Sequence, residues 1–219
     1  MPYEICYEDQ QSNLTKGSVD TILKELTQTQ YGEHVMLIHP RISTLSKAYS
    51  HYTKNQLVNN NEVVLLLPYY ETTDQVKNNL LTKSNNDDDN NNSDSNNNNS
   101  NTLDVHKHHK EGSLIIIDGI KAHFRSDLDI VSFTQNLERD AYSKGKSGIS
   151  ILVDMASHYH FGKPDDVVDH ELSLPSKYHD LKIKRFCIYH QRDFDRLKEE
   201  QKHIVRKHHG KELVLTETT

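Results

Sequence analysis

The chain contains little of the residue types that define several large classes of protein. Its 219 residues include two cysteines, Cys6 and Cys187, and no tryptophan. Two cysteines so far apart form neither a disulfide framework nor the close pairs that ligate structural zinc. The longest aliphatic run is residues 63–67 (VVLLL), far short of the about 20 residues that cross a bilayer. These absences exclude a disulfide-stapled scaffold, a zinc finger with paired cysteines and a membrane-spanning helix.

Signals for export and for nucleic-acid binding are also missing. The first ten residues, MPYEICYEDQ, have neither the basic flank nor the apolar stretch of a secretory signal. The 26 Lys and Arg residues are outnumbered by 32 Asp and Glu residues, for a formal net charge of −6. Direct binding to nucleic acid depends on basic surfaces, so it is not expected here. We expect a cytoplasmic protein without a membrane partner.

A low-complexity insert interrupts the chain at residues 83–110. The stretch is mostly Asn, Asp and Ser, and only Leu103 and Val105 are apolar. Such a composition buries too little surface to offset the entropy of ordering, so we expect the insert to be disordered. The flanking residues, 34–82 and 111–219, then form a single domain. Residues 1–33 form an N-terminal segment, with a helix at 17–30 that docks on the core.

Strand and helix patterns alternate along the rest of the chain. Short apolar runs predict strands at 34–39, 63–67, 114–117, 149–153, 183–189 and 212–215. Amphipathic stretches between them predict helices beginning near 43, 74, 127 and 164, with a last helix near 197–205. Several strands are apolar on both faces, which is typical of a parallel sheet covered on both sides. The sequence therefore predicts a three-layer α/β/α fold with a mostly parallel central sheet.

No phosphate-binding P-loop can be found. The turn after the first predicted strand, residues 39–44 (HPRIST), contains no glycine and cannot easily form an anion-binding nest. The tripeptide Gly145-Lys146-Ser147 resembles the end of a P-loop, but it follows a helix and precedes a strand, the reverse of the required order. Gly145 is better interpreted as a helix C-cap. We expect no nucleotide and no other cofactor.

Carboxylates and histidines follow the predicted strands. Asp118 and Asp154 each close an apolar run, and His158 and His160 come shortly after Asp154. If the strand continues there, the two histidines share a face, and Asp154, His158 and His160 could form a mononuclear metal site. The alternative interpretation is that each aspartate caps a turn and that the histidines are solvated.

Three segments resemble the MEDS domain, the methanogen/methylotroph sensory domain. Residues 32–40 (GEHVMLIHP) are similar to its opening Gly-x-His strand, and residues 147–159 (SGISILVDMASHY) to its fourth strand. The closing stretch from Phe186 is similar to its Cys-x-Tyr strand and terminal helix, with matches at Cys187, Tyr189, Arg192 and Phe194. The resemblance implies a RecA-like domain without a P-loop. It also implies a non-catalytic sensory role in signal transduction or transcription regulation, with a small-molecule ligand and a protein partner.

In a parallel sheet such a ligand binds beyond the carboxyl ends of the strands. The residues predicted to line this crevice are His39, Arg41, Tyr69, Asp118, Asp154, His158, Tyr189, His190 and Arg192. Two other functions stay open. One is a metal-assisted hydrolase that uses Asp118, Asp154, His158 and His160, and the other is an oligomeric scaffold.

Overall fold

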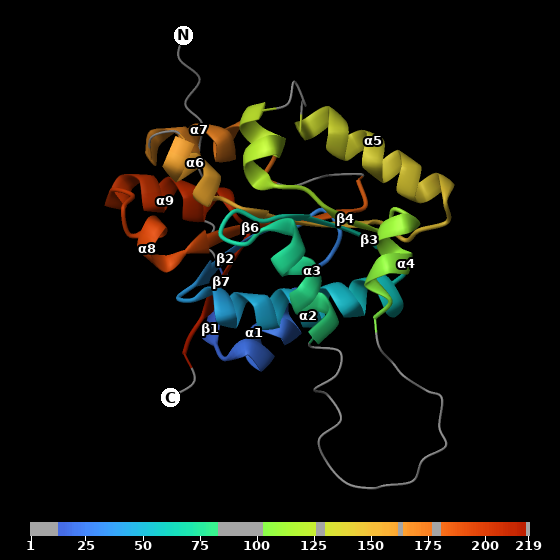
Figure 1. The fold of residues 1–219 in the computed structure, drawn as a ribbon. Coiled ribbons are helices and arrows are strands. Elements are labelled where there is room, and N and C mark those ends of the chain that lie inside the picture. The colour runs from blue at the N-terminus through green and yellow to red at the C-terminus, as the bar shows by residue number, and fades with distance from the viewer. Residues whose placement is uncertain (1–12, 83–102, 126–129, 162–163, 177–180, 218–219) are drawn as a thin grey trace, which may run out of the picture.

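Seven parallel strands form the central sheet. The computed structural model describes residues 13–82, 103–125, 130–161, 164–176 and 181–217 (Figure 1). In these residues the strand order is β1-β7-β2-β6-β5-β3-β4. The strands are β1 (Asn13–Gly17), β2 (His34–His39), β3 (Val63–Leu67), β4 (Leu114–Ile116), β5 (Ile149–Asp154), β6 (Ile183–His190) and β7 (Lys211–Leu215). Every residue of β2, β3 and β5 is buried, as expected for strands that are covered on both faces.

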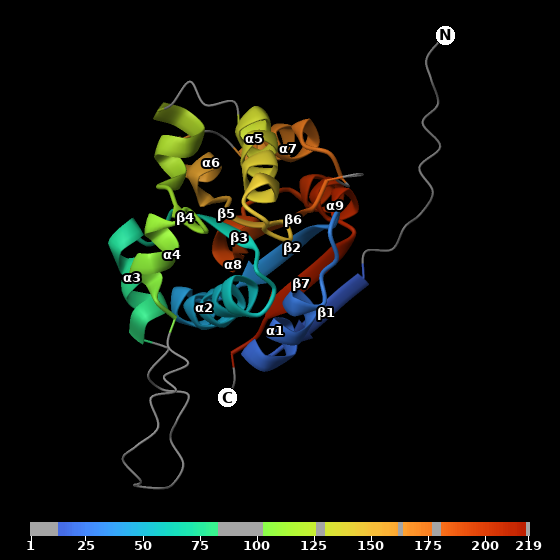
Figure 2. The ribbon, with the colours of Figure 1, turned by 90° about the vertical axis from the view of Figure 1, so that its right-hand side faces the viewer.

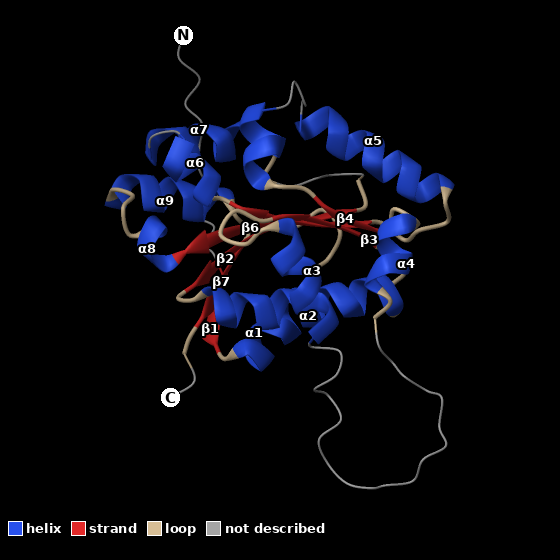
Figure 3. Ribbon diagram, in the orientation of Figure 1, coloured by secondary structure: helices blue, strands red, loops and turns tan. Residues whose placement is uncertain are grey.

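Helices cover both faces of the sheet. They are α1 (Val19–Thr27), α2 (Ile42–Val58), α3 (Thr73–Thr82), α4 (Val105–Lys110), the π-helical turn η1 (Lys121–Arg125), α5 (Ile130–Ser143), α6 (Ala156–Phe161), α7 (Pro164–Ser173), α8 (Gln191–Phe194) and α9 (Glu199–His208). The helices α1 to α4 lie on one face and the later ones on the other (Figures 2 and 3). The predicted three-layer α/β/α architecture is confirmed, and the fold is of the RecA-like α/β type.

The sheet has one hydrophobic core on each face, because successive side chains of a strand point to opposite faces. On β2, Val35 and Leu37 join the core under α1 to α4, whereas Met36 and Ile38 join the core under the later helices. The neighbouring β6 follows the same rule in register, with Met36 opposite Cys187. Residues of β2 and β6 that face the later helices can therefore meet side by side.

The carboxyl end of the predicted insert is ordered, which corrects its boundary. Residues 83–102 lie outside the described residues, as do residues 1–12 of the N-terminal segment. Leu103 and Val105 are each only 3% exposed and belong to the core under α1 to α4. Asp104 caps α4, since its side chain accepts the N–H of Lys107 at 2.9 Å. These two apolar residues, the exceptions in the insert's composition, anchor its end.

One predicted local feature is confirmed, and one observed strand was not expected. Gly145 ends α5 with a φ of 71°, the left-handed conformation expected of a C-cap glycine. The edge strand β1 was not predicted, because its pattern is polar and mostly exposed. No helix in the described ranges combines the length and the apolar character needed to cross a membrane.

Candidate metal centre

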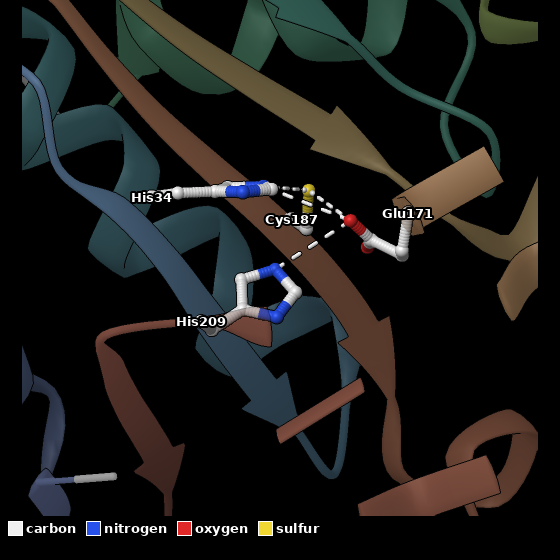
Figure 4. Close-up of side chains that lie close together, drawn as sticks. All are labelled: His34, Glu171, Cys187 and His209. Atoms are coloured by element: carbon white, nitrogen blue, oxygen red, sulfur yellow. Dashed lines mark hydrogen bonds and ion pairs between the residues drawn. The ribbon is translucent and has the colours of Figure 1, made fainter. Parts of the chain in front are cut away.

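Four buried side chains with metal-ligand chemistry converge on the face of the sheet that α5 to α9 cover. His34 begins β2, Glu171 lies on α7, Cys187 lies on β6 and His209 directly follows α9. One ligand atom from each lies within 4.8 Å of the others. Figure 4 shows the four side chains pointing toward one another. His34 and His209 are 1% exposed, and Glu171 and Cys187 are 0% exposed.

Three separations, all from the Glu171 carboxylate, match the edges of a metal coordination tetrahedron. The Glu171 Oε2 atom lies 3.7 Å from His34 Nε2, 3.6 Å from His209 Nε2 and 3.5 Å from Cys187 Sγ. His34 Nε2 lies 3.1 Å from Cys187 Sγ. Ligands bound tetrahedrally to zinc at about 2.0–2.3 Å are about 3.3–3.8 Å apart. The Glu171 carboxylate thus lies at zinc-ligand spacing from the other three donors, whereas the 3.1 Å between His34 Nε2 and Cys187 Sγ is shorter than a tetrahedral edge.

Neighbouring groups orient two of these ligands. The Nδ1 atom of His209 lies 2.8 Å from the carbonyl oxygen of Val205, so it carries the proton in neutral His209. The lone pair of Nε2 then faces the Glu171 carboxylate. The Tyr189 hydroxyl donates to the other carboxylate oxygen, Oε1. Such outer contacts are typical of metal sites, where they fix the ring orientation and the carboxylate position.

Burial shifts the pKa values of two of the four candidate ligands, His34 and Cys187. Burial, with smaller contributions from the charges of His209 and Arg185, holds the pKa of His34 well below its usual value. His34 is therefore a neutral imidazole at pH 7, the form that binds metal. Burial, followed by the Glu171 carboxylate, raises the pKa of the Cys187 thiol well above its usual value. Metal binding would release that proton, because the thiolate is the ligand.

A second group of histidines contains His158. Its ring lies 4.9 Å from that of His123 and 4.2 Å from that of His170, centroid to centroid. The predicted trio of Asp154, His158 and His160 does not come together. The reason is that residues 156–161 form the helix α6 rather than the end of a strand. Residues two apart on a helix point about 200° apart, so His160 faces outward and stacks on Tyr69.

Four of the predicted crevice residues meet in pairs at the carboxyl edge of the sheet. The Asp154 carboxylate, at the end of β5, accepts the backbone N–H of Tyr69 at 3.3 Å and that of Tyr70 at 3.4 Å. His39 and His190 end β2 and β6, and their rings are 5.1 Å apart. The Tyr70 ring lies 5.5 Å from that of His190 and so connects the two pairs.

The other predicted residues of the crevice do not belong to these pairs. Tyr189 points into the metal cluster, where it contacts Glu171. The Asp118 side chain accepts the backbone N–H of Lys121 at 3.0 Å and so caps η1, in agreement with the turn-capping alternative. Arg41 and Arg192 are exposed, but the Arg192 side chain contacts Tyr70 at the same edge of the sheet. The hydrolase quartet of Asp118, Asp154, His158 and His160 is therefore not assembled in one place.

A mostly apolar pocket adjoins Asp154 on the face that carries α1 to α4. Its walls include Leu45 and Tyr49 of α2, Val76 of α3 and Leu66 of β3. Burial raises the pKa of Asp154 to about 6, although three backbone N–H groups oppose this rise by donating to the carboxylate. The pocket therefore presents two carboxyl groups, those of Asp154 and Glu71, within a mostly apolar wall.

Sequence reasoning missed most of the metal-ligand cluster. Cys187 was named only as one of two distant cysteines and as a match to the MEDS motif, and His34, Glu171 and His209 were not singled out as ligands. Each of the four residues comes from a different segment of the chain. The sequence therefore lacks the short spacing between ligands by which metal sites are usually found. The residue types gave the available signal for metal ligands, since a histidine begins one apolar strand and a cysteine lies within another.

No family model and no curated protein matches the chain. The similarity to the MEDS domain stays a prediction that rests on the sequence motifs. His34, Cys187 and Tyr189 belong to those motifs, and all three lie in or beside the metal-ligand cluster.

Proposed function

We infer that this protein is a non-catalytic regulatory domain that binds one zinc ion through His34, Glu171, Cys187 and His209. The convergence of four buried donor atoms within 4.8 Å carries the proposal. Zinc accepts nitrogen, sulfur and oxygen donors in tetrahedral geometry. The Cys187 thiolate and the Glu171 carboxylate together would neutralise its two positive charges.

The closed geometry favours a structural or regulatory role over catalysis. Catalytic zinc sites keep one coordination position open for water or substrate, whereas structural sites use four protein ligands. All four candidate ligands are at most 1% exposed, which leaves no route for a substrate. A zinc ion bound at this site would link α7 and the end of α9 to β2 and β6. Metal binding would thereby change the stability of the surface that these helices present to a partner in signalling or transcription.

Small-molecule binding at the carboxyl edge is a second candidate function. The apolar pocket beside Asp154 supports it, because ligand pockets commonly combine apolar walls with a few polar groups. The Asp154 carboxyl would orient a hydrogen-bonding ligand there. This candidate agrees with the sensory role that the MEDS resemblance implies.

Cobalt substitution tests the zinc proposal directly. Protein stripped with a chelator should bind Co²⁺ and develop a thiolate-to-cobalt charge-transfer band. Cys187→Ser should abolish that band, whereas His203→Gln, which changes an exposed histidine of α9, should leave it intact. Circular dichroism would confirm that both variants fold. A wild-type protein without the charge-transfer band would overturn the proposal.

A further inference from the structure

Three histidines outside the zinc cluster converge from three separate segments. His123 lies on η1, His158 on α6 and His170 on α7. One ring nitrogen from each lies within 4.8 Å of the other two. The ring centroids are 4.9 Å apart for His123 and His158, 5.2 Å for His123 and His170, and 4.2 Å for His158 and His170.

One ring nitrogen of each histidine lacks a partner within the described part of the chain. The Nε2 atoms of His123, His158 and His170 are all buried and make no hydrogen bond there. His158 is only 5% exposed. A buried polar atom without a partner costs about 1–3 kcal/mol, so three in one place need a physical explanation. A cation at their centre would satisfy all three at once.

Their protonation also suits a cation. Burial is the main cause that lowers the pKa of His123 to about 3, of His158 to about 4 and of His170 to about 2. The three rings are therefore neutral at pH 7 and present lone pairs rather than positive charge.

We propose that His123, His158 and His170 form a second divalent-metal site, whose fourth coordination position takes a small anion. Three imidazoles leave the fourth position of a tetrahedral ion open. His123 and His170 are only partly buried, so this site lies nearer the surface than the zinc centre. Three neutral ligands compensate neither charge of the ion. Arg185 adds a positive charge that acts on all three histidines, whereas the Glu171 and Asp166 carboxylates act on His158 alone. An anionic fourth ligand would reduce that excess.

This site does not depend on the zinc centre, and the two can be counted separately. The metal titration uses Co²⁺ against a competing chelator, so that weakly binding surface histidines are not counted. Wild-type protein should bind two equivalents. His123→Gln should bind one and keep the thiolate charge-transfer band, because it leaves Cys187 untouched. His160→Gln, an exposed histidine on the same helix as His158, should still bind two.

Azide tests the open position. It should shift the cobalt d–d bands of wild-type protein and of Cys187→Ser, but not those of His123→Gln. Loss of a ligand should weaken cobalt binding at this site by more than about 100-fold, since loss of outer-shell partners alone weakens metal sites by 10–100-fold. His170→Gln provides a second variant, with circular dichroism to check folding.

The possible results separate the two sites. A single equivalent without a charge-transfer band, lost in His123→Gln, would support the histidine site and overturn the zinc centre. A second equivalent that persists in both His123→Gln and His170→Gln would overturn the histidine site. So would a wild-type stoichiometry of one equivalent that carries the charge-transfer band, or cobalt bands that azide does not shift.

Discussion

His209 directs Nε2 at the Glu171 carboxylate, 3.6 Å away, while its Nδ1 lies 2.8 Å from the carbonyl oxygen of Val205. In neutral His209 this arrangement brings a lone pair and a carboxylate oxygen face to face in a buried space. Either a proton or a metal ion between them removes the repulsion. His34 and Cys187 complete a tetrahedral ligand set around the same space, which favours the metal ion.

Zinc should stabilise the folded protein. A ligand that binds only the native state at 100 times its dissociation constant adds about 2.7 kcal/mol to the free energy of unfolding. Urea denaturation of chelator-treated protein, with and without zinc, measures this difference. The gain should be clearly smaller in His209→Gln than in His203→Gln, which changes an exposed residue of α9. Equal gains in the two variants would contradict the assignment of His209 as a ligand.

Tyr189→Phe should weaken zinc binding about 10- to 100-fold, as expected for loss of a group that orients a ligand. The variant removes the hydroxyl that donates to Glu171 but keeps the ring. The matched control is Tyr159→Phe, because the Tyr159 hydroxyl is buried without a hydrogen-bond partner among the described residues. Competition titration with a chromophoric chelator measures both affinities. Similar affinities for the two variants would show that Tyr189 plays no part in positioning Glu171.

Asp154 should make stability depend on pH. Burial raises its pKa from an ordinary value of 3.8 to about 6, so the folded state holds the proton more tightly than the unfolded state. Its contribution to stability is then full below about pH 4 and is lost as pH rises through 6. A shift of this size corresponds to about 3 kcal/mol.

Asp154→Asn does not titrate and serves as the reference for that measurement. Its free energy of unfolding relative to wild type should increase by about 2.4 kcal/mol between pH 4 and pH 7. Urea unfolding in the presence of a chelator measures the difference without a contribution from bound metal. A difference that does not change with pH would mean that Asp154 is not a buried acid with a raised pKa.

Leu103→Ala should destabilise the protein by about 2–5 kcal/mol, the usual loss for a leucine removed from a core. Leu103 is 3% exposed, although the surrounding sequence is a polar insert. Leu81→Ala on α3 is the control, since Leu81 is 39% exposed and should change stability little. Equal effects of the two substitutions on the unfolding midpoint would show that the end of the insert does not contribute to the core.

Nucleotides should not bind through Gly145-Lys146-Ser147. The Lys146 ammonium lies 2.9 Å from Asn61 Oδ1 on the surface, and Gly145 closes a helix instead of opening one. Calorimetry should detect no ATP or GTP binding that Lys146→Ala alters. Micromolar binding that this substitution abolishes would refute the interpretation.

Local sequence pattern determined most of the fold. The bounds of β2 and β3 follow directly from unbroken apolar runs, and such runs also indicate a sheet covered on both faces. The hydrophobic pattern did not predict the elements in which it is weak. The edge strand β1 is polar, and the short helix α6 was not predicted. The alternative metal site with His158 and His160 required a continued strand in place of α6.

Only the tertiary structure decided which side chains form the two clusters. His34 and Cys187 meet because β2 and β6 pair in parallel register, an outcome that no spacing in the sequence encodes. His170 and Glu171 are neighbours in the chain, yet they belong to different clusters. Consecutive side chains of a helix point about 100° apart. The α7 residues His170 and Glu171 therefore point into different clusters. A metal-ligand set drawn from distant elements depends on the packing that brings those elements together, and local sequence does not contain that packing.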